Sequence, residues 1–321
     1  MKYSLQNSGY LKTGLIIFFS VCSIVVVGQR KSVQEQLGYP KDAKLLIIHA
    51  DDVGVTHSEN AASISAMEQG CVNSASIMVP CPWFPEIAAY ARLHPEKDFG
   101  LHITLTSEWK YYKWGPVTPA QSVTGLVNKE GFFYSSVDSV VQNASSAEVE
   151  KEIRSQVNRA IQFGINPTHL DAHMYSLHQN VDFLKTFLKV GHEFKIPVFV
   201  YRQVENSLHI NLDSIVTDRD VIFDTILTAE PENFKSGMSD FYSNSLKNLK
   251  PGITYLILHT AYDDAEMKAV TVDHEGWGAT WRQKDYDFFS SPQCARILKE
   301  NNIYLVNWRE IRDKITRRNG L

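Results

Sequence analysis

Cysteine is scarce in this chain, and clusters of basic residues and long apolar runs are almost absent from it. The 321 residues include four cysteines, none of them in a Cys-x-x-Cys pair, so the sequence predicts neither a disulfide framework nor a cysteine-rich zinc site. Lysine and arginine are scattered and the formal net charge is −4, which excludes the basic footprint of a nucleic-acid-binding protein. A hydrophobic content of 44% is enough for the core of a globular protein.

One long apolar run does occur, near the N-terminus. It spans residues 15–28, and Lys2 and Lys12 are the only charged residues before it. A membrane span needs roughly 20 residues, whereas a basic start followed by a shorter run is typical of a signal peptide. We therefore expect a signal peptide at 1–28, a secreted or periplasmic location and no stable membrane span after processing. An uncleaved N-terminal membrane anchor is the alternative.

Beyond a polar linker at 29–42, apolar runs of strand length alternate with amphipathic segments of helical length. The expected strands are 45–49, 74–79, 99–105, 168–173, 197–201, 253–259 and 303–306, and the expected helices are 59–69, 84–94, 147–163, 181–194, 240–249 and 285–301. This alternation predicts an α/β fold with a parallel sheet. About seven parallel strands with surrounding helices favour a single closed or nearly closed barrel over residues 43–315.

Acidic residues and histidines gather at the carboxyl ends of these strands, where barrel enzymes carry their chemistry. In chain order they are Asp51, Asp52, His102, His169, Asp171, His173 and His259, and Arg202 follows the fifth strand. A lone buried histidine is more often a hydrogen-bonded core residue than a ligand. Several such residues at one rim of one barrel indicate a metal site.

Spacing decides which of these side chains can meet. His169, Asp171 and His173 are separated by two, so they can share one face of a strand; a polar strand end satisfied by water is the alternative. Asp51 and Asp52 are neighbours, which point to opposite faces of an extended strand, so only a turn can bring both into one site. The glycine at position 54 permits such a turn.

A mixed set of aspartate and histidine suits Zn²⁺, Co²⁺, Mn²⁺ or Fe²⁺, and less typically Mg²⁺. A site with three protein ligands leaves positions for water and substrate, and such a metal lowers the pKa of bound water toward about 7. This arrangement favours hydrolysis, with a nearby carboxylate to take the proton of the water and a histidine to protonate the leaving group.

Four ordered segments resemble the YdjC-like carbohydrate deacetylases, which are related more distantly to the polysaccharide deacetylases. They are LIIHADDVG at 46–54, GLHITLT at 100–106, PTHLDAH at 167–173 and LILHT at 256–260. The resemblance spans about residues 44–312. It implies a distorted (β/α) barrel that removes the acetyl group from N-acetylated sugars with one divalent metal ion, Mg²⁺ or Zn²⁺.

Position by position, the resemblance also implies roles. Asp52, His102 and His173 match the metal ligands, and Asp51 matches the general base that activates water. His259 falls where the family has a histidine near the end of a late strand, and it is the candidate acid for the leaving amine.

Other positions match the family less closely. Arg202 is a candidate to orient the base or to contact substrate, with a structural salt bridge as the alternative, and His169 and Asp171 are candidate supporting residues. Tyr175 and Leu177 stand where the family often has histidines. These departures bear on the substrate rather than on metal binding, because none of them removes a proposed ligand.

Aromatic residues gather in two segments. They are Trp109, Tyr111, Tyr112 and Trp114 after the third strand, and Trp277 and Trp281 near the C-terminal helix. Aromatic faces stack on sugar rings, so both segments are candidate walls of a sugar-binding site. Packing of these segments on the barrel is the alternative.

The sequence therefore predicts a metal-dependent hydrolase that deacetylates an N-acetylated amino sugar, a mono- or oligosaccharide rather than a polymer. A metal-dependent phosphoesterase or another amidohydrolase is one alternative, weakened by the lack of a basic cluster at the strand ends. A non-catalytic carbohydrate-binding protein is the other, and the five reactive residues that remain together weigh against it. The expected partner is an acetylated amino-sugar substrate, and a homo-oligomer stands as an alternative to a monomer.

Overall fold

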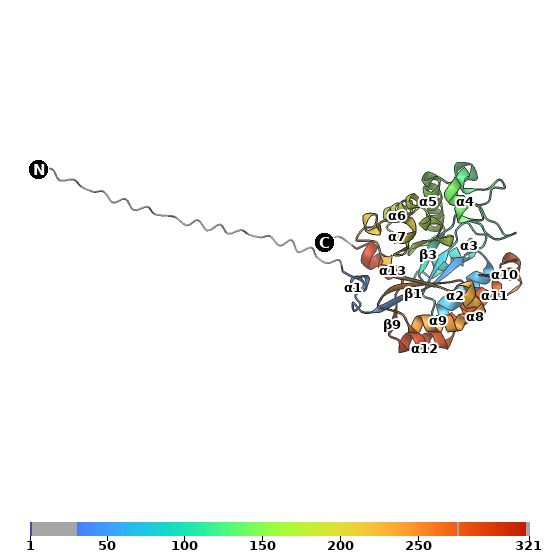
Figure 1. Ribbon diagram of the computed structural model, residues 1–321. Helices are drawn as coiled ribbons and strands as arrows, with labels where there is room; N and C mark the ends of the chain where they lie inside the picture. The colour runs from blue at the N-terminus through green and yellow to red at the C-terminus, as the bar shows by residue number, and fades with distance from the viewer. Residues whose placement is uncertain (2–30, 275, 319–321) are drawn as a thin grey trace. The chain divides into compact units, whose positions relative to one another are not determined.

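Parallel pairing of buried strands builds the sheet at the centre of the fold (Figure 1). The strands are β1 Lys44–Val53, β2 Ser74–Ile77, β3 Phe99–Ile103, β4 Leu170–Ala172, β7 Thr225–Thr228, β8 Gly252–Leu258 and β9 Ile303–Leu305. Their order is β4-β3-β2-β1-β8-β7, and β9 pairs with the first half of β1. Every pair in this sheet is parallel, as the alternating pattern of the sequence predicts.

A second pair of strands continues the curve of this sheet. β5 Val200–Tyr201 pairs with β6 Ile222–Phe223 in parallel. On one side the Phe199 N–H donates to the Leu170 carbonyl at 2.8 Å, and on the other the Asp224 N–H donates to the Ile253 carbonyl at 3.1 Å. These bonds join the pair to β4 and β8, so the strands form the distorted (β/α) barrel that the resemblance implies.

The structure is a computed structural model that describes Met1, residues 31–274 and residues 276–318. Contacts group the chain from Lys31 onward into one unit. Apart from Met1, the predicted signal peptide at 1–28 lies outside the described residues, so it stays a prediction. Within the described residues, we find no helix whose length and apolar character would let it cross a membrane.

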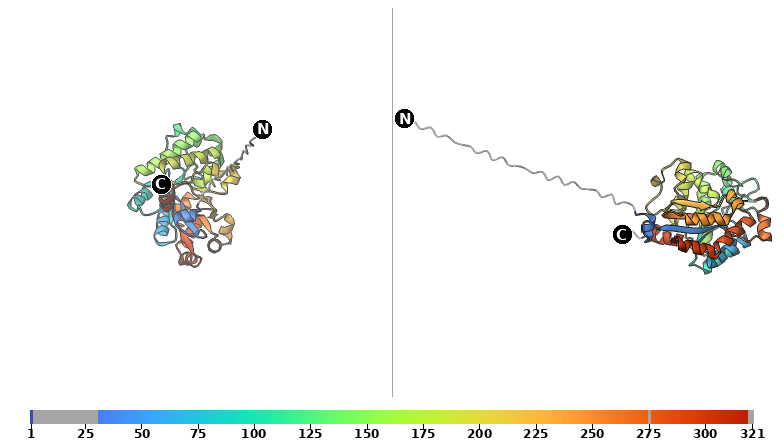
Figure 2. Two further views of the ribbon diagram at one scale, coloured as in Figure 1. Left: turned by 90° about the vertical axis from the view of Figure 1, so that its left-hand side faces the viewer. Right: turned by 60° about the horizontal axis from the view of Figure 1, so that its bottom comes forward.

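Helices surround the strands, as the three views of Figures 1 and 2 show. They are α1 Val33–Leu37, α2 His57–Gln69, α3 Phe84–Leu93, α4 Val137–Asn143, α5 Ser146–Gln162, α6 Val181–Phe194, α7 Val204–Leu208, α8 Pro231–Ser236, α9 Met238–Lys247, α10 Ala265–Val270, α11 Ala279–Phe289, α12 Pro292–Glu300 and α13 Trp308–Ile311. Short polar side chains begin several of them; Ser145, for example, accepts from the Glu148 N–H and forms a capping box with that residue.

Several elements differ from the sequence-based expectation. The short helices α4, α7, α8, α10 and α13 were not expected. The single helix expected at 285–301 is two helices, because Ser291 caps α12 and Pro292 has no N–H to continue α11. The strands β6 and β7 were not expected, since each is short and Asp224 separates them. Part of the segment expected as a linker forms α1, whose Leu37 is buried in a hydrophobic cluster.

Alternation along the strands divides the core into two clusters. Leu46 and Ile48 belong to the cluster between the sheet and the helices, and Leu45 and Ile47 belong to a second cluster inside the barrel. Trp308 fills that interior. The centroid of its ring lies 4.7 to 6.4 Å from the ring centroids of His169, Phe199, Phe223 and Tyr255. Each fully buried Leu or Ile contributes about 1.5–3 kcal/mol to the hydrophobic stabilisation. The same alternation points the residues that follow, His49 and Asp51, into the barrel.

Gly100 leaves room for a polar group in this interior. A Cβ at this position in β3 would overlap the ring of His169, which stacks on Trp308 at 4.7 Å. A side chain here would therefore displace a buried ring from a close-packed environment.

We predict that Gly100→Ala lowers the free energy of unfolding by about 1–3 kcal/mol, because overpacking forces the His169 ring out of its position. Denaturant unfolding measures this change. Gly276→Ala is the matched control, since a Cβ there meets no heavy atom within 4 Å. Equal stability of the two variants would show that the interior adapts at no cost.

Candidate metal centre

A bulge in β1 brings two adjacent carboxylates into one site. Ala50 pairs with Ala75 and Val53 pairs with Ile77, so β1 has one residue more than β2 between these pairs. Asp52 has the left-handed backbone angle φ 64°. Aspartate tolerates this conformation better than most residues, although it costs about 1–2 kcal/mol. The bulge turns Asp52 toward the cavity that Asp51 already faces.

Gly54 completes the turn that the sequence predicts. Its φ is +101°, and a Cβ there would lie 3.3 Å from the Met78 carbonyl oxygen. The Gly54 N–H donates to the Asn60 side chain at 2.7 Å, which ties the turn to α2. The turn therefore depends on this glycine and on the backbone of Asp52 together.

Asp52, His102 and His173 converge in the barrel interior. The Asp52 Oδ1 atom lies 3.4 Å from His102 Nε2 and 3.1 Å from His173 Nδ1, and the candidate ligand atoms of all three lie within 4.8 Å of one another. Ligands at 2.0–2.1 Å from a tetrahedral ion lie roughly 3.3 Å apart, so the observed separations fit one ion. Asp52 Oδ1 is also buried and has no hydrogen-bond partner among the described residues, as expected of an atom free to bind a cation.

Arg282 holds the other oxygen of Asp52. Its Nη2 atom lies 2.8 Å from Asp52 Oδ2, and its Nη1 atom pairs with Glu59 of α2. Burial alone would raise the pKa of Asp52, but the Arg282 guanidinium and the His173 ring outweigh it and hold that pKa well below its usual range. Asp52 is therefore a carboxylate at every physiological pH.

Two further carboxylates orient the histidines. Asp171 Oδ1 lies 2.7 Å from His102 Nδ1, and Glu108 Oε2 lies 3.1 Å from His173 Nε2. Each contact leaves the opposite ring nitrogen facing Asp52. Carboxylate partners of this kind fix the tautomer and orientation of metal-binding histidines.

Asp51 and His259 flank this group. Asp51 Oδ2 lies 3.8 Å from His102 Nε2, and His259 Nε2 lies 3.8 Å from Asp52 Oδ2. Burial lowers the pKa of His259 more than the Asp52 charge raises it, and with the contribution of the Arg282 charge the pKa is about 4. His259 is therefore neutral near pH 7. Its backbone N–H donates to Asp285 Oδ2 at 3.0 Å, which fixes the end of β8 against α11.

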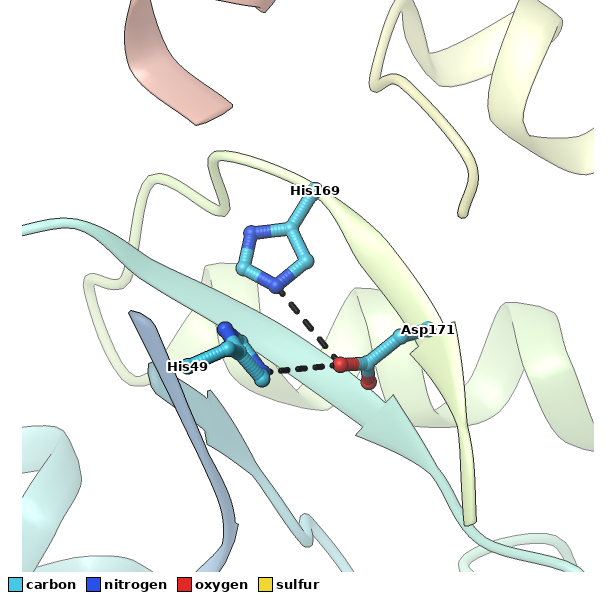
Figure 3. Close-up of side chains that lie close together, drawn as sticks. All are labelled: His49, His169 and Asp171. Atoms are coloured by element: carbon cyan, nitrogen blue, oxygen red, sulfur yellow. Dashed lines mark ion pairs between the residues drawn. The ribbon is translucent and has the colours of Figure 1, made fainter. Parts of the chain in front are cut away.

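Behind the metal-binding group, His49 and His169 point at one oxygen of Asp171 (Figure 3). The His49 Nε2 atom lies 2.9 Å from Asp171 Oδ2 and the His169 Nε2 atom lies 3.7 Å from it. His169 is wholly buried, and its Nδ1 atom contacts the Thr168 hydroxyl at 3.0 Å. His169 thus lies in the packed interior, away from the cavity.

The site opens into a cavity of about 450 Å³. Its aromatic lining consists of Trp109, Tyr175, Phe199, Tyr255 and Trp277. Met174 and Tyr175, which follow His173, both have left-handed backbone angles, with φ 53° and 52°. Consecutive strained residues beside a buried histidine are typical of functional sites.

Several aromatic residues that the sequence marks as sugar contacts lie elsewhere. Trp114 and Trp281 are buried and do not line the cavity; Trp114 donates to the Thr106 carbonyl at 2.8 Å, and Trp281 stacks on Phe234 at 5.1 Å. The predicted contact role is wrong for both, because packing takes up their faces. The remaining two tyrosines of the first segment also lie outside the cavity lining, at positions 111 and 112.

Arg202 is a second correction. Its guanidinium lies at the surface, 3.4 Å from Glu205 and 4.0 Å from Asp213, so it does not orient Asp51. The buried arginine of the site is Arg282, which the sequence did not indicate, since it belongs to no motif and lies on a helix 230 positions after Asp52.

Comparison with known proteins gives a consistent result. The family model described as YdjC-like protein matches residues 45–300. A protein of Thermus thermophilus named carbohydrate deacetylase is 26% identical over 276 residues, which cover 85% of this chain and 95% of the relative. A protein of the same name from Thermoanaerobacter pseudethanolicus is 25% identical over 267 residues, covering 83% of this chain and 98% of the relative.

A solved structure supports the fold. The crystal structure of a protein from Enterococcus faecalis V583 matches with a TM-score of 0.69 at 21% sequence identity, covering 84% of this chain and 99% of that chain. At this level of identity the match indicates a shared fold.

We predict that Asp52→Asn, His102→Ala and His173→Ala each weaken the binding of Zn²⁺, because each removes or weakens a ligand atom. The loss of affinity exceeds the roughly 10–100-fold that follows when a residue that only hydrogen-bonds to a ligand is removed. Competition with a chromophoric chelator measures the affinity. Arg202→Ala is the control and retains full affinity. Undiminished affinity in all three ligand variants would contradict the assignment.

Proposed function

The chain belongs to the YdjC-like protein family, and we propose that it is a metal-dependent carbohydrate deacetylase that removes the acetyl group from an N-acetylated amino sugar. The observation that carries this proposal is the convergence of Asp52, His102 and His173 on one point, with Asp51 beside them at a cavity of about 450 Å³. The names of the relatives, carbohydrate deacetylase, support the choice of reaction.

The cofactor that we propose is one divalent cation held by Asp52, His102 and His173. One carboxylate and two imidazoles suit Zn²⁺ and its first-row neighbours better than Mg²⁺, which prefers oxygen ligands. When bound, such a cation supplies Lewis-acid polarisation of a carbonyl oxygen and acidifies water.

In this proposal Asp51 is the general base. It lines the cavity and lies outside the ligand set, so its carboxylate remains available to take the proton of the attacking water. His49 Nε2 lies 3.1 Å from Asp51 Oδ1, which leaves Asp51 Oδ2 toward His102 and the cavity.

His259 is the proposed acid for the departing nitrogen. It lines the cavity on the side of Asp52 that faces Arg282. Because His259 is neutral near pH 7, the proton that it passes to the nitrogen is the one that Asp51 takes from the water, rather than one that an imidazolium brings into the reaction. Acetate and a free amine are the products.

The proposed substrate is a mono- or oligosaccharide without a phosphate group. Trp109 and Trp277 line the cavity, and aromatic side chains suit the apolar faces of a sugar ring. Among the described residues no lysine lines the cavity, and its one arginine, Arg282, is already paired with two carboxylates. This charge distribution weighs against the phosphoesterase alternative.

The test of this proposal is acetate release. The metal-loaded protein is incubated with a panel of N-acetylated and O-acetylated mono- and oligosaccharides, and free acetate is measured. Release from an N-acetylated amino sugar supports the proposal. Phosphate release from sugar phosphates without any acetate release would decide for a phosphoesterase, and sugar binding without either product would decide for a binding protein.

We predict that Asp51→Asn retains the metal but lowers kcat for acetate release by roughly 10²–10⁴-fold, the usual effect of losing a general base. Metal content by elemental analysis and kcat from the initial rate of acetate release are the two measurements. Loss of the metal together with activity would show that Asp51 is a ligand rather than the base.

We predict that Trp277→Ala raises KM by roughly 2–10-fold, since Trp277 is 38% exposed and lines the cavity, and stacking contributes about 0.5–1.5 kcal/mol. Tyr111→Ala is the matched control: its ring is 75% exposed and lies outside the cavity lining, so KM stays unchanged. The same KM in both variants would remove Trp277 from the sugar site.

A further inference from the structure

His49 is wholly buried and contacts two carboxylates of the site, Asp51 and Asp171. Its Nε2 atom lies 3.1 Å from Asp51 Oδ1 and 2.9 Å from Asp171 Oδ2. Asp171 in turn bonds to His102, one of the proposed metal ligands, at 2.7 Å. One imidazole therefore lies between the proposed base, Asp51, and Asp171, the carboxylate behind a proposed ligand.

The surroundings of His49 hold its ring in one orientation. Its Nδ1 atom contacts the Ser74 hydroxyl at 2.9 Å, and its Nε2 atom also contacts the Ser76 hydroxyl at 3.0 Å. The ring stacks on Tyr255 at 4.8 Å and meets the edge of His169 at 5.0 Å. A ring stacked on a tyrosine and held at both nitrogens cannot turn away from the carboxylates.

We propose that His49 is a positioning residue that holds the Asp51 carboxylate toward the cavity and, through Asp171, fixes the orientation of His102. This inference rests on the proposed function, because Asp51 acts there as the base. Outer hydrogen bonds of this kind set the geometry that the reacting groups require, and their loss lowers affinity or activity without removing a ligand.

A second metal site is the competing interpretation of the same residues. The candidate ligand atoms of His49, His169 and Asp171 also lie within 4.8 Å of one another, and His169 Nε2 has no hydrogen-bond partner among the described residues. The His49–Asp171 distance of 2.9 Å, however, is that of a hydrogen bond and is shorter than the roughly 3.3 Å between ligands of a tetrahedral ion. The separations in the Asp52 group, 3.1 and 3.4 Å, bracket that value.

The experiment compares His49→Leu with His49→Gln. Leucine keeps the apolar volume between Tyr255 and His169 but donates nothing to the carboxylates, whereas the amide of glutamine reaches the region of Nε2 and restores a donor. His178→Gln is the control for loss of a buried histidine, since His178 bonds to the Phe199 carbonyl at 2.9 Å and contacts neither carboxylate.

We expect His49→Leu to lower kcat for acetate release by roughly 10–100-fold with KM changed less than about twofold, and His49→Gln to recover most of that loss. His178→Gln keeps the wild-type kcat. The Zn²⁺ affinity, measured without substrate, falls in His49→Leu, because Asp171 loses its contact with His49 and orients His102 less firmly. Saturating Zn²⁺ still binds at one ion per chain.

Three results would overturn the inference. Two ions per wild-type chain and one per His49→Leu chain would make His49 a ligand. Wild-type kcat in His49→Leu would show that Asp51 needs no support. Equal loss of kcat in the leucine and glutamine variants, with equally lowered melting temperatures, would show a structural role only. If the wild-type protein releases no acetate from any sugar, the proposed function fails instead. The Zn²⁺ affinities then still test whether His49 fixes the orientation of His102 through Asp171.

Discussion

The one-residue bulge of β1 is the constraint on which the site depends. An ordinary strand would send Asp51 and Asp52 to opposite faces, one into the barrel and one toward the helices. The left-handed backbone at Asp52 places both carboxylates at one cavity, where they can serve different purposes. The interior alternation of β1, which begins with Leu45 and Ile47, then supplies His49 as the residue directly beneath them.

The barrel interior concentrates negative charge, and its stability requires that each charge has a partner. Arg282 pairs with Asp52 and Glu59, and the histidine rings separate the remaining carboxylates. Removing one member of a buried pair costs about 3–5 kcal/mol, because the other charge stays behind without compensation. Burial lowers the pKa of His49 less than Asp171 and Asp51 raise it, so that pKa is about 8 and the ring carries positive charge near neutral pH. A divalent cation at Asp52 would offset part of the remaining negative charge.

Much of this arrangement follows from local patterns in the chain. Alternating runs predicted the parallel strands, and spacing by two predicted that His169 and His173, which flank β4, point to the same side as Asp171 within it. The predicted ligand residues do converge, because strands of one barrel bring their carboxyl ends to one rim.

The parts that sequence patterns missed depend on contacts between distant segments. Nothing local to Arg282 on α11 reveals that it meets Asp52, and nothing local to Glu108 reveals that it meets His173. For the aromatic segments the residue type predicted too much. Trp114 is a residue type that often contacts sugars, but here it is buried within its own loop. Residue type predicts what a side chain can do, whereas burial and partners decide what it does.

The central claim is that a cation binds at Asp52, His102 and His173. Anomalous diffraction from crystals grown with Zn²⁺ tests it most directly, because the signal locates the ion without reference to activity. The account predicts one dominant peak within roughly 2.0–2.3 Å of an Asp52 oxygen, His102 Nε2 and His173 Nδ1. A dominant peak between His49, His169 and Asp171, with none at Asp52, would contradict it.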